Sequence, residues 1–118
     1  MPIVNALASI AVKDLASTTA WYEKVPGKPA DSKSMPEVAE WKFQRGGWLQ
    51  VYQLPERAGS GSFTLAVTNI ENLVARLKAF GIDTTHRNSG PKVETPMIAD
   101  PDGNHIAFAE TRDPNMAH

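Results

Sequence analysis

The stretch ALASIAVKDL, residues 6–15, returns in related form as GSFTLAVTNI at residues 61–70. Both stretches alternate their larger aliphatic residues with small or polar ones, which is typical of a half-buried strand. Each strand is followed by Asp14 or Asn69, whose short side chain can accept hydrogen bonds from the first turn of a helix. The repeat therefore predicts two copies of a strand–cap–helix unit.

An amphipathic helix is predicted after each cap, because apolar residues recur there with the spacing of one helical face. The face of the first helix comprises Leu15, Thr18, Tyr22 and Val25. The face of the second comprises Ile70, Leu73, Val74, Leu77 and Phe80. Pro26-Gly27 and Gly81 are predicted to end the two helices, since glycine tolerates the left-handed conformation of a helix C-terminus.

After each helix, two segments with strand character form a predicted hairpin. The pairs are Val38–Gln44 with Trp48–Gln53, and Val93–Ala99 with His105–Glu110. The segments 28–36 and 82–91 are rich in turn residues, and each is expected to hold one more strand, at an edge. The whole chain is predicted to be one domain. Its parts are module one at 1–55, a linker at 56–60, module two at 61–112 and a tail at 113–118.

The composition excludes several classes of function. Twelve basic and thirteen acidic residues give a formal net charge of −1, and no cluster of Lys or Arg would follow a phosphate backbone, so nucleic acid is not an expected partner. The chain has no cysteine, which excludes disulfides and thiolate sites. The apolar stretch at residues 3–12 is too short to cross a bilayer, so we expect no membrane partner and a cytoplasmic protein.

Four short segments carry a resemblance to a known family. They are IAVKDL at 10–15, WYEK at 21–24, DPDGN at 100–104 and IAFAE at 106–110. In this order, and inside a duplicated module, they resemble the vicinal oxygen chelate superfamily, which includes glyoxalase I, extradiol dioxygenases, fosfomycin-resistance enzymes and bleomycin-binding proteins. The resemblance implies an α+β fold in which two βαβββ modules form an incomplete eight-stranded curved sheet. It also implies a ligand pocket on the side of the sheet away from the helices.

Strand alternation then predicts which side chains line that pocket. If the large aliphatic residues of each strand face the helices, their neighbours face the ligand. The predicted ligand-binding residues are Leu7, Ser9, Trp48, Gln50, Tyr52, Ser62, Thr64, His105 and Ala107. Trp48 and Tyr52 are candidates for stacking on a planar ligand, or for simply filling the space between the modules.

For the strand before Trp48, the sequence does not show which face is buried. Trp41 and Phe43 share one face of it, and alternation does not decide whether that face meets the pocket or the core, although core packing is favoured. Glu40 and Lys42 are interpreted as surface or rim charges.

The resemblance also implies where a metal ion would be held. Metal-dependent relatives place His, Gln or Glu at four positions, which here align with Leu7, Gln50, Ser62 and Ala107. A catalytic divalent site needs about three strong protein ligands, and only Gln50 has a ligand-type side chain. We therefore predict no metal of the family type and no other cofactor.

Two functions remain open, together with an assembly role. The first is a small-molecule-binding protein without the family metal site, which resembles bleomycin-resistance proteins and holds its ligand in a cavity between the modules. The alternative is a glyoxalase-like lyase or isomerase, or a dioxygenase-related enzyme, that uses His105 as a general base or a non-standard metal site. For His105 a side chain at the pocket rim is the plainer interpretation. In either case a small organic ligand and a homodimer are expected. In the third possibility, the assembly role, the domain serves mainly to bind a partner chain, which closes the pocket.

Overall fold

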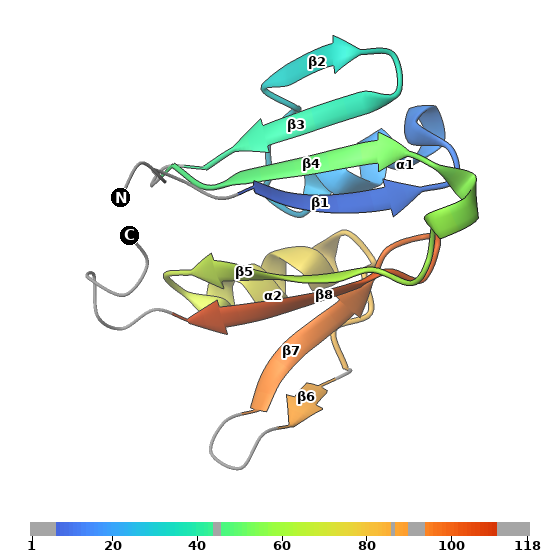
Figure 1. The fold of residues 1–118 in the computed structure, drawn as a ribbon. Helices are drawn as coiled ribbons and strands as arrows, with labels where there is room; N and C mark the ends of the chain where they lie inside the picture. The colour runs from blue at the N-terminus through green and yellow to red at the C-terminus, as the bar shows by residue number, and fades with distance from the viewer. Residues whose placement is uncertain (1–6, 44–45, 86, 90–93, 111–118) are drawn as a thin grey trace, which may run out of the picture.

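The computed structural model describes residues 7–43, 46–85, 87–89 and 94–110 (Figure 1). Each half of the chain contains one helix and four strands. The first half contains β1 (Leu7–Val12), α1 (Leu15–Lys24), β2 (Ser32–Met35), β3 (Val38–Lys42) and β4 (Trp48–Gln53). The second contains β5 (Ser62–Val67), α2 (Ile70–Ala79), β6 (Arg87–Ser89), β7 (Glu94–Ala99) and β8 (His105–Glu110). A short 3-10 helix, η1 (Pro55–Arg57), connects the halves.

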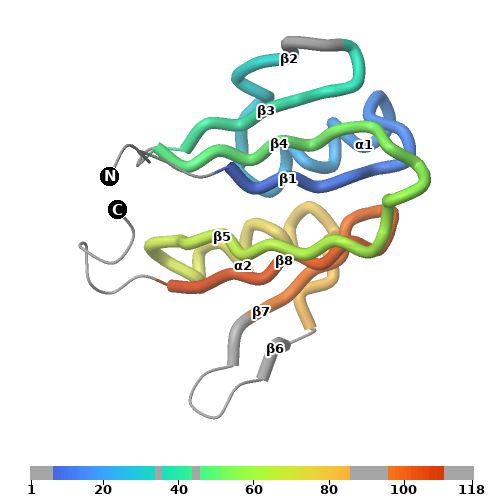
Figure 2. The backbone as a smooth tube through the Cα atoms, in the orientation of Figure 1, coloured from blue at the N-terminus to red at the C-terminus, as the bar shows by residue number. Residues whose placement is uncertain are grey.

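The strands form two four-stranded sheets with the same topology, β1-β4-β3-β2 and β5-β8-β7-β6. In each sheet the two central strands run antiparallel, and the first strand of the half pairs in parallel with the last. The sheets lie side by side, with β1 next to β5, and both helices lie behind them (Figure 1). The backbone trace follows the same path twice, as the repeat predicts (Figure 2). The predicted α+β fold with paired βαβββ units is confirmed.

The helix predictions hold except at one residue. Asp14 accepts a hydrogen bond from the amide of Ala16 at 3.1 Å, and Asn69 accepts one from the amide of Asn72 at 3.1 Å, so both are N-caps. The predicted face of α1 is buried. On α2 the assignment of Phe80 to the buried face is wrong: Phe80 is 48% exposed, because it is the C-cap and its backbone has left the helical conformation.

Strand bounds differ only at the ends. β3 ends at Lys42, two residues before the predicted end, and the predicted residues Ala6, Gln44 and Val93 lie outside the described part of the chain. The extra strand expected in each turn-rich segment is present as β2 and β6. The predicted linker begins within η1, while the predicted tail at 113–118 lies outside the described residues.

One core lies between the helices and the sheets. Alternate strand residues face it, and burial of this apolar surface is the main stabilising contribution to the fold. Its fully buried members include Val12, Tyr22, Trp41, Leu49, Val51, Leu77, Ile98, Ile106 and Phe108. Trp41, whose orientation the sequence does not determine, points into this core. Its ring centroid lies 6.2 Å from that of Tyr22. Phe43 packs against the same core and is partly buried.

Asn104 joins the two halves of the chain from the turn before β8. Its side chain is fully buried. The amide nitrogen Nδ2 donates to the Ala11 carbonyl at 2.9 Å and to Asp100 at 2.8 Å. The oxygen Oδ1 accepts from the backbone amides of Gly59 at 3.1 Å and Gly61 at 2.8 Å. The segment DPDGN is thus a turn, and its final residue also fixes β1 and the connection into β5.

Asp100 and Asp102 extend this junction. The Tyr22 hydroxyl donates to Asp100 Oδ2 at 2.6 Å inside the core, and the Lys13 amide donates to Asp102 Oδ2 at 2.9 Å. Burial and the neighbouring Asp100 carboxylate raise the pKa of the Tyr22 hydroxyl well above its ordinary value. Tyr22 is therefore held neutral as a hydrogen-bond donor.

Replacing Tyr22 with Phe should flatten the loss of stability at alkaline pH. Since the folded pKa of Tyr22 lies above its unfolded value of about 10, the stability it contributes is complete below pH ~10 and decreases as the pH rises further. Tyr22→Phe should cost roughly 1 kcal/mol at pH 7 and weaken this dependence. Urea unfolding from pH 8 to 11 measures it, with Tyr52→Phe as control. An unchanged alkaline slope in Tyr22→Phe would contradict the assignment.

Candidate functional site

The candidate site is the open face, by which we mean the side of the two sheets opposite the helices (Figure 1). All nine predicted ligand-binding residues lie on the strands with the alternation that faces this side, and their core-facing neighbours are more buried. Leu7 is 48% exposed, whereas Trp48, Gln50 and Tyr52 are half-buried. Their placement agrees with the alternation, and their role in binding stays a prediction.

On the first sheet the strand register arranges the open face in three rows. Each row crosses β1, β4 and β3. The rows are Leu7–Trp48–Lys42, Ser9–Gln50–Glu40 and Ala11–Tyr52–Val38. A polar row therefore lies between two rows that each carry an aromatic ring.

The middle row is a directed chain of hydrogen bonds. The Ser9 hydroxyl donates to Gln50 Oε1 at 3.3 Å, and Gln50 Nε2 donates to Glu40 Oε2 at 3.3 Å. Each donor points toward Glu40, which stabilises the carboxylate through dipoles aligned with its charge. The second Gln50 N–H and the second Glu40 oxygen have no partner among the described residues.

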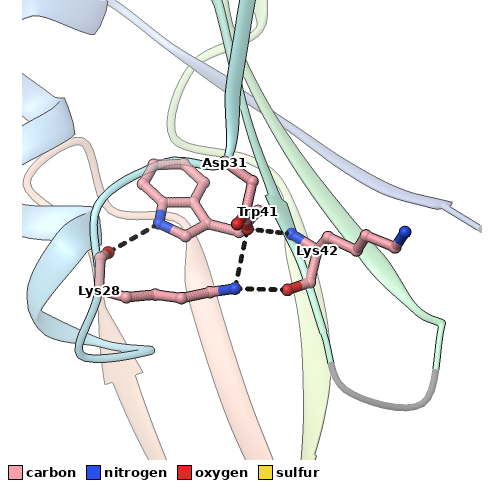
Figure 3. A network of polar contacts seen from close by, with 4 residues as sticks. All are labelled: Lys28, Asp31, Trp41 and Lys42. Carbon is pink, nitrogen blue, oxygen red and sulfur yellow. Dashed lines mark hydrogen bonds and ion pairs between the residues drawn. The ribbon is translucent and has the colours of Figure 1, made fainter.

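Lys42 brings a positive charge to the first row. Its ammonium nitrogen lies 5.5 Å from the centroid of the Trp48 ring, within the range of a cation–π contact. The backbone of Lys42 is fixed from the other side by Asp31, whose carboxylate accepts the Lys42 amide at 2.7 Å, and by Lys28, whose ammonium donates to the Lys42 carbonyl at 2.6 Å (Figure 3).

Lys28 and Asp31 are themselves paired at 2.8 Å, and Trp41 Nε1 donates to the Lys28 carbonyl at 3.0 Å. The pKa of Asp31 is lowered, chiefly because its carboxylate accepts a hydrogen bond from the Lys28 ammonium and secondly from the Lys42 amide. Figure 3 shows the Lys42 side chain extending away from this cluster. The cluster thus fixes the end of β3 and leaves the ammonium available.

Glu40 and Lys42 were missed as site residues, because they were interpreted as surface or rim charges. Once Trp41 is known to face the core, alternation in β3 sends both charged side chains to the open face. The sequence did offer a way to predict this: a tryptophan can be buried in a core, whereas two charged side chains on the opposite face of the same strand cannot. Nothing in the sequence around Lys28 and Asp31 indicates that they contact β3, because these contacts form only when the chain folds back after α1.

The open face of the second sheet is lined by small side chains. Its residues are Ser62, Thr64, Ala66, Ala99, Ala107 and Ala109, together with Met97 and His105. His105 is exposed and lies in register with Ser62 and Ala99, and its ring has no hydrogen-bond partner among the described residues.

His105 and Trp48 are not brought together within one chain. His105 follows Asn104, which contacts Ala11, whereas Trp48 is in register with Leu7 at the other end of β1, so the two residues lie at opposite ends of the sheets. A general base is normally oriented by a second group. Because none contacts the His105 ring among the described residues, its catalytic role stays a prediction.

The residues at the four family metal positions do not fit a divalent ion. Leu7 and Ala107 offer only carbon atoms, Ser62 offers a neutral hydroxyl, and the amide oxygen of Gln50 already accepts from Ser9. Within the described residues, no group of three or more His, Asp or Glu side chains is placed to hold a metal.

No described helix is both long enough and apolar enough to cross a membrane.

The comparisons with known proteins agree on the family. A glyoxalase-like domain model matches residues 8–109. A glyoxalase/bleomycin resistance protein from Catenulispora acidiphila has 27% identity and a TM-score of 0.83, with 92% of this chain and 99% of that one covered. No curated protein matches the chain.

Two further solved structures share the fold. TnmS3, an antibiotic-binding protein from a Streptomyces species, has 21% identity and a TM-score of 0.73 over 93% of this chain and 98% of that one. A lactoylglutathione lyase from Agrobacterium tumefaciens has 21% identity and a TM-score of 0.73 over 92% and 94%. One binds and the other is named as an enzyme, so the fold alone does not decide the activity. The chain belongs to the glyoxalase-like family, within the glyoxalase/bleomycin-resistance superfamily.

Proposed function

We propose that this protein binds a small planar organic molecule on the open face of the first sheet, without the metal site of its family. The observation that carries the proposal is the polar row of Ser9, Gln50 and Glu40 between Trp48 and Tyr52. Aromatic rings stack on planar groups, while a few hydrogen-bonding groups fix orientation. The antibiotic-binding activity of TnmS3 supports this choice.

A second copy of the chain is the proposed cover of the bound ligand. The open face leaves Leu7 exposed and both aromatic side chains only half-buried. A closed two-fold dimer buries such a surface with its own counterpart. Light scattering at micromolar concentration should give twice the chain mass, and a monomer would contradict the dimer. The cytoplasmic location remains a prediction for cell fractionation.

Replacing Trp48 with Ala should remove most of the binding. Loss of one stacking ring weakens affinity by roughly tenfold. A panel of planar aromatic compounds, followed by thermal shift and then calorimetry on the hits, measures the effect. Phe80→Ala is the control, because Phe80 is an exposed aromatic residue at the end of α2, on the helix side of the sheets and away from the open face. Binding that is unchanged in Trp48→Ala, or absent from the wild-type protein across the panel, would contradict the proposal.

The alternative is an enzyme of the lyase, isomerase or dioxygenase type. The Agrobacterium lyase supports it at the level of the fold, whereas the solitary His105 ring and the donor set at the metal positions weigh against it. Elemental analysis of protein purified without chelators separates the two. We expect no stoichiometric zinc, nickel, manganese or iron, and a tightly bound equivalent would favour the enzyme.

A further inference from the structure

Two opposite charges on the open face are neighbours that do not pair with each other. Glu40 and Lys42 lie two residues apart on β3 and face the same side, so their Cα atoms are about 7 Å apart. Among the described residues neither forms an ion pair. Gln50 holds the Glu40 carboxylate on one row, and the Trp48 ring holds the Lys42 ammonium on the next.

Both charged groups are positioned in advance. The Lys42 backbone is fixed at its amide by Asp31 and at its carbonyl by Lys28, and its ammonium lies over the Trp48 ring. The hydrogen bonds from Ser9 through Gln50 run toward Glu40 and stabilise its negative charge. Fixing these groups before binding lowers the entropy that a ligand must otherwise offset.

We propose that the ligand of this site is a planar molecule that carries an anionic group at one end and an N–H or ammonium donor at the other. The anionic group contacts Lys42 at the Trp48 ring, and the donor contacts the free oxygen of Glu40. This inference rests on the proposed function and adds the chemical class and orientation of the ligand. The reverse orientation would place like charges together on both rows, which is unfavourable.

Three related benzene derivatives test the inference. They are 4-(aminomethyl)benzoate, which has both groups, benzoate, which lacks the donor, and 4-(aminomethyl)benzamide, which lacks the anion. Lys42→Met should weaken binding of the two carboxylates by roughly fivefold to tenfold and leave the benzamide within about twofold. Glu40→Gln should weaken the two amines by a similar factor and leave benzoate unchanged. Lys42→Arg retains the charge and should retain the preference for carboxylates.

The pattern of losses decides the result. An equal loss of affinity for all three probes in either variant, or no loss in either variant, would overturn the inference. Neither charge would then contribute to selection of the ligand. If the planar panel binds but none of these three probes does, this inference fails while the proposed function stands. If the panel also fails to bind, the proposed function fails with it. Circular dichroism of each variant confirms that the fold is retained.

Discussion

Asn104→Ala should destabilise the protein by about 3–5 kcal/mol, a large part of the stability of a typical domain. The substitution removes four hydrogen bonds at a fully buried position. It leaves the part-buried amides of Gly59 and Gly61 and the buried carbonyl of Ala11 without this partner, and polar groups left unpaired away from water carry a desolvation penalty. Urea unfolding followed by fluorescence should show a lower midpoint with a similar slope.

Asn72→Ala is the matched control for this experiment. Asn72 is exposed on α2, and its side chain forms no hydrogen bond with any described residue, so Asn72→Ala should change the stability by less than about 0.5 kcal/mol. A loss below about 1 kcal/mol in Asn104→Ala would mean that water or a shifted backbone replaces the lost partners. The junction between the halves would then not depend on this side chain.

Gly59→Ala should cost about 2–4 kcal/mol, because two separate effects act at the same position. Gly59 has a φ of 95°, in the region that residues with a Cβ disfavour. A Cβ there would also lie 2.6 Å from the carbonyl oxygen of Asp102, which is backbone and cannot rotate away. The clash would push apart the connection into β5 and the turn before β8. Thermal unfolding measures the change.

Two other glycines separate these effects. Gly81 has a φ of 80° with open space around it, so Gly81→Ala should show the cost of conformation alone, about 1 kcal/mol. Gly47 has no positive φ and no close neighbour in the described part of the chain, and Gly47→Ala should be nearly neutral. If Gly59→Ala costs no more than Gly81→Ala, the contact with Asp102 contributes nothing.

Much of the fold could be predicted because its determinants are local. The caps Asp14 and Asn69, and the alternation in β1, β4, β5 and β8, are readable over a few residues each. The repeat then joins these local patterns into two equivalent units. Phe80 shows the limit: its spacing fits the helical face, but the helix ends one residue earlier.

The side chains of the candidate site were predicted correctly only in strands whose own residues show which face is buried. In β4, Leu49 and Val51 are both aliphatic, which identifies the other face. In β3, the aromatic and charged residues alternate, and the choice depends on Trp41 meeting the ring of Tyr22 from α1. Contacts between segments far apart in sequence leave no local pattern, which is also why the role of Asn104 was not foreseen.

The two sheets meet at the seam between β1 and β5 (Figure 1). Among the described strands, these two share no ladder of backbone hydrogen bonds. The halves are therefore joined by side chains and not by a continuous sheet: Ile10 lies against Gly61, and Asn104 Nδ2 donates to the Ala11 carbonyl. The Tyr22 and Lys13 contacts with Asp100 and Asp102 add to this connection. A substitution at Ile10, which faces the core, therefore acts on the union of the two halves from a position off the open face.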